Sequence, residues 1–263
     1  MMADIEIAAK WVAEACSVVV LTGAGMSAES SVPTFRDAQT GLWERFEPEH
    51  LATEDAFRAD PSLVWTWYVW RSMLIDTAVP NAGHTAIGAW QKHLAVNNGA
   101  LTVATQNVDD LHERGGADDV LHLHGSLHNY RCLECSRPAA FDSRAAGIRA
   151  EQEFDKDNIL EPVACPHCAT GILRPGVVWF GEMLPQDAFN SAIHALQQAD
   201  LVLVVGTSGL VQPAASLPVI GQEAGAKLVE INPVHTELSN AADIYLKSTA
   251  AAMMPQLLDE LLA

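Results

Sequence analysis

Short apolar runs alternate with helix-like segments along most of the chain, and this alternation constrains the fold more than any other feature. An apolar strand needs cover on both faces, as in a parallel sheet flanked by helices. The pattern therefore predicts an α/β fold with a doubly wound, Rossmann-like parallel sheet. The expected strands are residues 17–21, 101–105, 120–124, 176–180, 201–205 and 227–231. The expected helices are residues 8–15, 53–76 with a break at Pro61, 81–98, 186–198, 213–224 and a C-terminal helix from near Ala250.

The pairs Cys132-x-x-Cys135 and Cys165-x-x-Cys168 are the strongest local signal. Two such pairs match a tetrahedral zinc site, and four thiolate ligands leave no open position, so the metal would be structural. A set of four cysteines also accepts other soft metals. A redox role would need one reactive pair at a helix N-terminus, which two pairs in one module do not suggest. His167, inside the second pair, is expected to be a bystander.

Residues 128–175 hold all four of these cysteines, a charged helical stretch at 143–156 and little continuous apolar sequence. We interpret this segment as an inserted module. With the helical segment 38–75 it would form a smaller, discontinuous zinc-binding domain. The large domain would then comprise residues 1–37, 76–127 and 176–263.

Composition limits the classes of function. The chain has 263 residues, of which 49% are hydrophobic and 18% charged, as in folded globular proteins. A formal charge of −18 disfavours nucleic acid and membrane surfaces as partners and favours basic, lysine-bearing ones. No apolar run approaches the roughly 20 residues that span a bilayer, and the first residues lack the basic segment of a signal peptide. Together with the metal-type cysteines, this predicts a cytoplasmic protein, which we expect to be a monomer.

Polar or glycine residues directly follow five of the expected strands. In an open parallel sheet, ligands bind at the carboxyl ends of the strands. Each exit alone would be an ordinary turn, but five at one edge predict a binding site. The exits are Gly23, Gln106-Asn107-Val108-Asp109, His124-Gly125, Gly206-Thr207-Ser208 and Asn232.

The chemistry of these exits suits a nucleotide. Gly23-Ala24-Gly25 would let backbone N–H groups approach a pyrophosphate at a helix N-terminus. Asn232-Pro233 would contact an adenosine edge, although local grounds slightly favour a simple turn. His124, at the same edge as Asn107, suits a general base near neutral pH, against the alternative of a core or turn histidine.

Several motifs occur in a fixed order: Gly23-Ala-Gly-Met-Ser-Ala-Glu-Ser30, Pro33-Thr-Phe-Arg-Asp37, Gly41-Leu-Trp43, Thr105-Gln-Asn-Val-Asp-Asp-Leu-His112, His124-Gly125, both cysteine pairs, Val178-Trp-Phe-Gly-Glu182 and Gly206-Thr-Ser208. With these motifs the chain resembles the sirtuins, NAD-dependent protein lysine deacylases, along nearly its whole length. One departure is Ser31, where the family usually has Gly, and this implies a stiffer cofactor loop.

The resemblance implies that NAD is consumed as a co-substrate. The acyl carbonyl oxygen would attack C1′ of the ribose, nicotinamide would leave, and His124 would deprotonate a ribose hydroxyl that attacks the imidate carbon. Free lysine and O-acyl-ADP-ribose would result. Phe35 would exclude water, and Arg36 and Asp37 would support the loop. The implied catalytic residues are His124, Asn107 and Asp109. The implied cofactor contacts are Gly23, Ala24, Gly25, Ser27, Glu29, Phe35, Arg36, Asp37, Trp43, Gln106, Asn107, Asp109, Gly206, Thr207, Ser208, Asn232, Pro233 and Ala250.

The resemblance also implies that an acyl-lysine protein substrate lies as a β-strand along Val178, Trp179, Phe180, Gly181 and Glu182 and beside residues 209–211. Tyr68 and Arg71 are three apart, so they share a helix face. From spacing alone, a salt bridge of Arg71 to Glu54, Asp55 or Asp76 is favoured. The pair is, however, similar to that of the sirtuin subgroup that removes succinyl, malonyl and glutaryl groups, whose carboxylate it would bind. We therefore expect removal of both acetyl and acidic acyl groups.

Other functions remain as alternatives. A mono-ADP-ribosyltransferase would cleave NAD in the same way but transfer ADP-ribose to protein, and a plain deacetylase would not use Arg71. A non-enzymatic NAD sensor or zinc scaffold would need none of Asn107, Asp109 and His124. The net charge of −18 disfavours a zinc-ribbon nucleic-acid binder.

Overall fold

The computed structural model describes residues 2–32, 51–147 and 159–262. Its main feature is a six-stranded parallel sheet in the order β3-β2-β1-β6-β7-β8. In chain order this is 3-2-1-4-5-6, the doubly wound Rossmann arrangement, in which the strand order reverses between β1 and β6. The predicted fold class is therefore confirmed. The strands are β1 (Ser17–Thr22), β2 (Ala100–Thr105), β3 (Leu121–His122), β6 (Leu201–Val205), β7 (Lys227–Ile231) and β8 (Ile244–Leu246).

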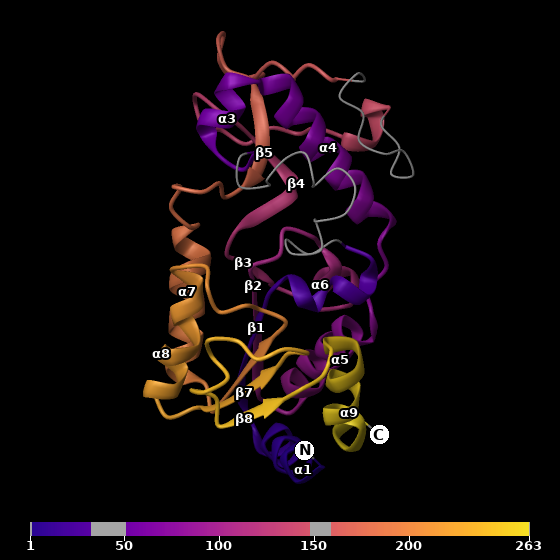
Figure 1. Cartoon of the computed structure of the whole chain (residues 1–263), viewed down its shortest axis with the longest axis vertical. Helices are drawn as coiled ribbons and strands as arrows, with labels where there is room; N and C mark the ends of the chain where they lie inside the picture. The colour runs from indigo at the N-terminus through magenta and orange to yellow at the C-terminus, as the bar shows by residue number, and fades with distance from the viewer. Residues whose placement is uncertain (1, 33–50, 148–158, 263) are drawn as a thin grey trace.

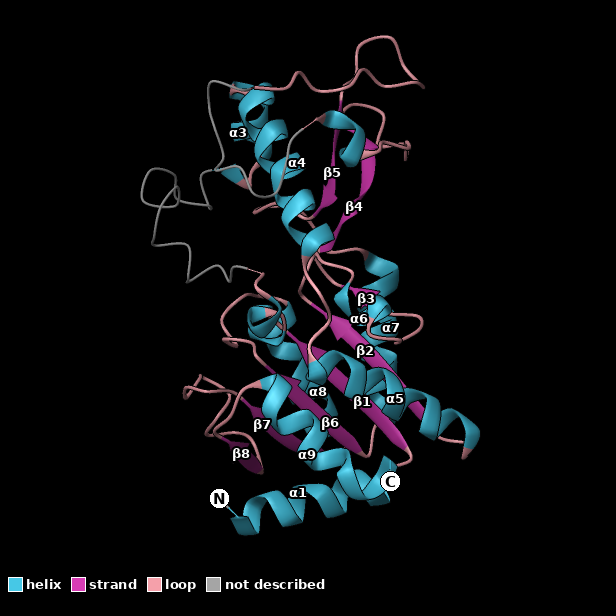
Figure 2. Ribbon diagram, turned by 90° about the vertical axis from the view of Figure 1, so that its right-hand side faces the viewer, coloured by secondary structure: helices cyan, strands magenta, loops and turns pink. Residues whose placement is uncertain are grey.

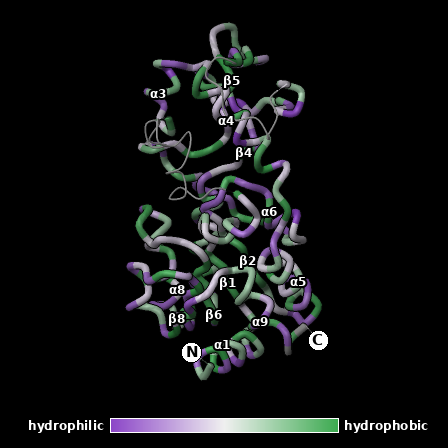
Figure 3. Tube along the Cα trace, turned by 45° about the vertical axis from the view of Figure 1, so that its right-hand side comes forward, coloured by the Kyte–Doolittle hydropathy of each residue, from purple (hydrophilic) through white to green (hydrophobic). Residues whose placement is uncertain are grey.

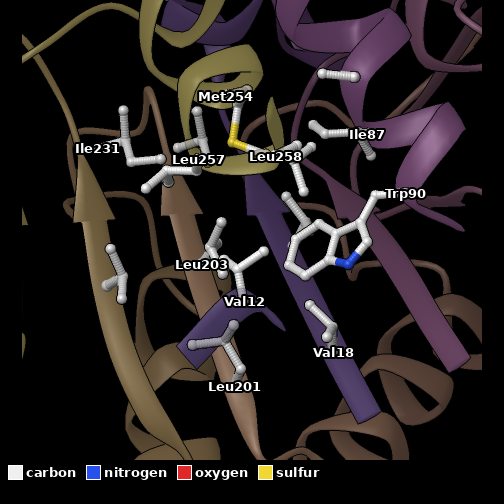
Figure 4. Packing of buried hydrophobic residues seen from close by; sticks show 14 of the residues in the cluster. Val12, Val18, Ile87, Trp90, Leu201, Leu203, Ile231, Met254, Leu257 and Leu258 are labelled. Carbon is white, nitrogen blue, oxygen red and sulfur yellow. The ribbon is translucent and has the colours of Figure 1, made fainter. Parts of the chain in front are cut away.

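Helices cover both faces of this sheet, which explains why its central strands are almost wholly buried (Figure 1). One core cluster joins the sheet to α1, α5 and α9, and a second joins it to α7 and α8. Figure 4 shows the first of these, with Trp90 of α5 beside Val18 and with Met254, Leu257 and Leu258 of α9 above the strands. The helices are α1 (Met2–Glu14), α5 (Ala82–Val96), α6 (Leu111–Arg114), α7 (Gln186–Gln198), α8 (Leu217–Glu223) and α9 (Ala250–Leu262).

A second body lies at the other end of the molecule (Figure 2). It contains the antiparallel pair β4 (Gly125–Cys132) and β5 (Leu173–Val177), with α3 (Glu54–Ala59) and α4 (Pro61–Thr77). A separate aromatic-rich cluster forms its core, including Trp65, Trp179 and Tyr68. Hydropathy along the trace shows apolar segments at both ends of the molecule, as two cores require (Figure 3).

Local signals set the helix starts. Asp60 caps α4 by accepting the Leu63 N–H, and Pro61 occupies the first helical position, where a missing N–H costs nothing. Asn81 caps α5 by accepting from Gly83 and His84, while Nδ1 of His84 accepts from the Asn81 N–H. The predicted break at Pro61 and start at Asn81 are therefore confirmed.

The segment 176–180 was expected to be a strand of the main sheet, and this was wrong. The strand is β5, which ends at Val177 and pairs with β4. Its apolar residues are buried against α4 and the aromatic cluster rather than against the main sheet. The chain leaves the main sheet after the two-residue β3, turning at Gly125, whose φ of 73° lies in the left-handed region.

Other boundaries also differ from expectation. Helix α1 begins at Met2 rather than Ala8, and the three-residue strand β8 was not predicted. The helix expected at 213–224 begins as a 3₁₀ turn over residues 214–216 before α8. The stretch expected to be helical from 143 begins as a 3₁₀ turn over residues 143–146, and positions 148–156 lie outside the described residues.

None of the described helices has both the length and the apolar character needed to cross a bilayer. The proposed division into a large and a small domain is compatible with two cores at opposite ends of the molecule, and its boundaries remain a proposal.

Trp90 should dominate the stability of the large core, since its side chain is fully buried. Trp90→Ala should lower the free energy of unfolding by about 3–5 kcal/mol. Trp90→Phe should cost much less, because Phe keeps most of the apolar area and removes an indole N–H that has no partner among the described residues. Urea unfolding followed by circular dichroism measures both. Equal losses for the two variants would contradict this packing argument.

Candidate active site

The carboxyl ends of β1 and β6 touch at the point where the strand order reverses. Gly23 donates to the Val205 carbonyl at 3.0 Å, and Gly25 donates to the Gly206 carbonyl at 2.8 Å. A Cβ on Gly25 would lie 2.8 Å from the Cα of Gly206, so only glycine allows this approach. The two loops are thereby fixed to each other.

The sequence predicted that Gly23 and Gly25 would let their N–H groups approach a pyrophosphate, and the structure shows a different role for these two glycines. The N–H groups of Gly23 and Gly25 are used within the protein, so they are not free for a pyrophosphate. The amide between them, of exposed Ala24, makes no hydrogen bond with the described chain and remains a donor suited to a phosphate oxygen. No α-helix follows in residues 23–32 as described, where two 3₁₀ turns lie instead. Ser31 has a φ of 62°, a conformation that glycine adopts more readily.

Ser27 links the first loop to the polar residues after β2. Its hydroxyl donates to Oδ2 of Asp109 at 2.9 Å and accepts from Nδ2 of Asn107 at 3.0 Å. All three residues are buried. Burial raises the pKa of Asp109, while hydrogen bonds from Leu111 and Ser27 oppose that change. Asn107 and Asp109 are thus held in fixed orientations at the strand edge.

His84 belongs to the same cluster and was not predicted. Its Nδ1 accepts the Asn81 N–H, so Nε2 carries the proton of the neutral ring, 3.4 Å from the Ser27 hydroxyl. Burial lowers the pKa of His84 to about 4, so it is neutral at physiological pH. The spacing Asn81-x-x-His84 at a helix start was the available signal.

His124 lies at the same edge and is poised as a base. Its Nδ1 contacts the Gln106 carbonyl at 3.0 Å, and a carbonyl can only accept, so Nδ1 carries the proton and Nε2 keeps its lone pair. Burial lowers the pKa of His124, an effect that the Gln106 bond opposes. In contrast, His122 contacts Glu113 at 2.6 Å; burial acts to lower the pKa of His122, but Glu113 outweighs it and the pKa is raised.

The other predicted cofactor residues divide into two groups. Near the loops, Thr207 accepts from Gln106 at 3.1 Å, Asn232 donates to the Thr207 carbonyl at 2.8 Å, and Ser208 and Pro233 are adjacent in the chain. The second group lies where the first loop meets the start of α9: exposed Glu29 accepts from the Ala251 N–H, and Ala250 is buried in the same core cluster as Met26. Phe35, Arg36, Asp37 and Trp43 lie outside the described residues.

Tyr68 and Arg71 of α4 do not form the salt bridge that spacing favoured. Arg71 makes no ion pair with a described carboxylate: Glu54 pairs with Arg58, and Asp76 with Arg144. Arg71 is half-buried, and Cζ of its guanidinium lies 4.8 Å from the centroid of the Trp67 ring. Burial lowers the pKa of Arg71, and Tyr68 and Asp109 oppose this change.

The segment predicted to bind a peptide is already heavily hydrogen-bonded. Val178 donates to the His124 carbonyl and Phe180 to the Ala52 carbonyl. Glu182 is occupied by Arg174 and by the Trp179 N–H. Phe180 and the positive-φ Gly181 are exposed, as are Leu210 and Val211 in the loop after β6.

The four paired cysteines form a metal-type cluster, with their sulfurs all within 4.8 Å of one another. Backbone N–H groups of Glu134, Cys135 and His167 point at these sulfurs and would stabilise thiolates. His167 itself contacts the Pro138 carbonyl through Nε2, as expected of a bystander. The donor set and geometry fit one structural zinc ion.

Fold and site together define a doubly wound α/β protein with a nucleotide-type site at the strand reversal and a cluster of four cysteines. The profile of the Sir2 family matches residues 23–213. A NAD-dependent protein deacylase of Corynebacterium glutamicum is 46% identical over 261 residues, covering 97% of this chain and 95% of that one. NAD-dependent protein deacylase Sir2 of Mycolicibacterium smegmatis is 45% identical over 244 residues, covering 93% and 96%. The chain belongs to the Sir2 family.

Solved structures agree with this assignment. The crystal structure of a Sir2 homologue–NAD complex has a TM-score of 0.85 and 42% identity, covering 98% of this chain and 95% of that one. A Sir2 homologue mutant in complex with 2′-O-acetyl ADP-ribose has a TM-score of 0.84 and 42% identity, covering 97% and 96%.

Gly171 should be essential for the metal cluster, because a Cβ there would lie 2.8 Å from the sulfur of Cys168 and even closer to that of Cys132. Gly171→Ala should therefore lower zinc content well below one ion per chain and reduce thermal stability. Thr170→Ala, at an exposed neighbour, is the control. Elemental analysis of the purified variants tests this. Full zinc occupancy in Gly171→Ala would contradict the geometry.

Proposed function

We propose that the protein is an NAD-dependent protein-lysine deacylase that removes acetyl groups and also the acidic succinyl and malonyl groups. Its products would be nicotinamide, free lysine and O-acyl-ADP-ribose. Membership of the Sir2 family, and relatives that are named NAD-dependent protein deacylases, support the reaction class. Relatives solved with NAD and with acetyl ADP-ribose support NAD as the co-substrate.

The residues at the strand edge have separate roles in this proposal. Nε2 of His124 accepts the proton of a ribose hydroxyl, since Nδ1 is committed to the Gln106 carbonyl. Asn107 and Asp109, oriented by Ser27, hold the ribose and nicotinamide ends of NAD. The free amide of Ala24 and the Thr207–Ser208 turn serve the phosphates. Zinc has only a structural role.

One observation carries the acyl specificity, namely a half-buried Arg71 without a carboxylate partner among the described residues. A cation in such surroundings is stabilised by an anion. Tyr68, on the same helix, is buried, and its pKa is raised to about 12 by burial, so its hydroxyl stays protonated and can donate. A terminal carboxylate on the acyl chain would satisfy both groups.

The partners in this proposal are protein segments that carry acyl-lysine, lying along residues 178–182 as an added strand. The charge of −18 favours basic segments over nucleic acid. We further propose a monomer in the cytoplasm, where the cysteine thiols remain reduced for metal binding.

The pH dependence should identify the base. Because the pKa of His124 is lowered, kcat/KM should fall at acidic pH through an apparent pKa below the usual 6.5 of histidine. His124→Ala should lose about 100- to 10,000-fold in activity. Initial rates between pH 5 and 9 measure the profile. An acidic limb above pH 6.5 that shifts in His122→Gln would assign the base to His122, whose pKa is raised.

The decisive experiment compares one peptide carrying succinyl-lysine or acetyl-lysine, with and without NAD, by mass spectrometry. Arg71→Met should lower desuccinylation about 10- to 100-fold, because it removes charge-assisted hydrogen bonds of about 1.5–3 kcal/mol. Deacetylation should change much less. Arg58→Met, the same substitution at an exposed arginine, is the control.

Each result separates the candidates. Loss of acetyl alone would retain the deacylase and reject the role of Arg71. ADP-ribose attached to protein would favour a mono-ADP-ribosyltransferase. No NAD-dependent loss of either acyl group would reject the deacylase.

A further inference from the structure

Trp179 lies in the segment proposed to bind the peptide and contacts Tyr68, one of the two residues proposed to bind the acyl terminus. Its side chain is 1% exposed, and its indole Nε1 donates to the hydroxyl oxygen of Tyr68 at 2.9 Å. The ring also packs against Phe57, with centroids 5.2 Å apart. Trp179 therefore contacts Tyr68 within the small core, where both side chains are buried.

A buried ion pair fixes this tryptophan at two points. The guanidinium of Arg174, itself 3% exposed, stacks on the indole face with Cζ 3.3 Å from the ring centroid. Arg174 pairs with Glu182, and Oε2 of Glu182 accepts the backbone N–H of Trp179 at 2.8 Å. Ring and backbone are thus held by the same pair, so the direction of the indole N–H is set.

The hydrogen bond from Trp179 to Tyr68 determines whether the Tyr68 hydroxyl can donate to another group. An indole N–H is only a donor, so the Tyr68 oxygen must accept, and the phenol proton must point elsewhere. Trp179 is the only described residue within hydrogen-bond distance of this hydroxyl. Arg71, beside Tyr68, also offers only donors and has no described carboxylate partner. Arg71 and the Tyr68 hydroxyl therefore place hydrogen-bond donors side by side on α4.

We propose that Trp179 is a positioning residue for acyl specificity, whose indole N–H makes Tyr68 a donor toward the acyl terminus and so selects a carboxylate over an uncharged isostere. The inference rests on the proposed removal of acidic acyl groups and deepens it. A carboxylate brings only acceptors, whereas a terminal carboxamide of the same length brings an NH2 that meets further donors.

The test uses lysine peptides with a succinyl group and with its carboxamide analogue, which differ only in the terminal group. The readout is the ratio of their kcat/KM values, in which any general loss of activity cancels. Trp179→Phe keeps the aromatic ring but removes the N–H, and should lower this ratio about 3- to 10-fold. Trp65→Phe, in the same core cluster but with its ring packed against Tyr130 and Phe141, should leave the ratio unchanged.

A double-mutant cycle separates positioning from damage to the fold. Tyr68→Phe should also lower the ratio, and Trp179→Phe combined with Tyr68→Phe should lower it no further, because Trp179 acts through Tyr68. Zinc content reports that each variant is folded.

Three outcomes would overturn the inference. An unchanged ratio in Trp179→Phe removes the role of the N–H, and strictly additive losses in the cycle mean that Trp179 does not act through Tyr68. If the unmodified protein does not remove succinyl groups with NAD, both the proposed acyl specificity and the inference are rejected. If it does remove them but Trp179→Phe leaves the ratio unchanged, only the inference is rejected.

Discussion

The contact between the backbones of Gly25 and Gly206 is the constraint on which the site depends. It joins the ends of β1 and β6 at the strand reversal, where any side chain on either residue would collide with the other loop. Once these loops are fixed, Ser27 hydrogen-bonds to Asn107 and Asp109. Thr207 accepts hydrogen bonds from Gln106 and Asn232. Polar groups from β1, β2, β6 and β7 thus hold one another in place before any ligand arrives. Preorganisation of this kind reduces the cost of orienting NAD for cleavage.

In the proposed function, the two ends of the site would differ in hydrogen-bonding character. The strand edge mixes donors and acceptors, because Asp109, the Gln106 carbonyl and the lone pair of His124 all accept. The α4 end, in the described part of the chain, offers the donors of Arg71 and Tyr68. The Tyr68 oxygen already accepts a hydrogen bond from Trp179. A substrate whose polarity matches both ends would carry a ribose at one and an anion at the other. This asymmetry arises from tertiary contacts between α4 and the chain beyond β5.

The sequence predicted the parallel sheet well, since continuous apolar runs such as 201–205 are buried on both faces and occur where expected. It failed for 176–180, because an apolar run reports burial but not which core buries it, and β5 belongs to the small core. The sequence pointed to Gly23 and Gly25 but not to the reason for them, because Gly25 packs against Gly206, which is distant in the chain. Spacing also favoured a salt bridge for Arg71, yet Asp76 is occupied by Arg144, a pairing that no local pattern could reveal.

The net charge of −18 sets a limit on how an acidic acyl group can be recognised. Succinylation changes a lysine from a positive to a negative charge, so at long range the substrate is repelled more than an acetylated one. Ionic screening over about 8 Å at physiological salt weakens that repulsion between exposed charges. A half-buried arginine is screened much less, and Arg131 and Arg174 share the carboxylate of Glu182. In the proposed function, selectivity for an acidic acyl group would therefore come from short-range contacts at Arg71 and Tyr68, so the orientation of a single phenol proton would matter.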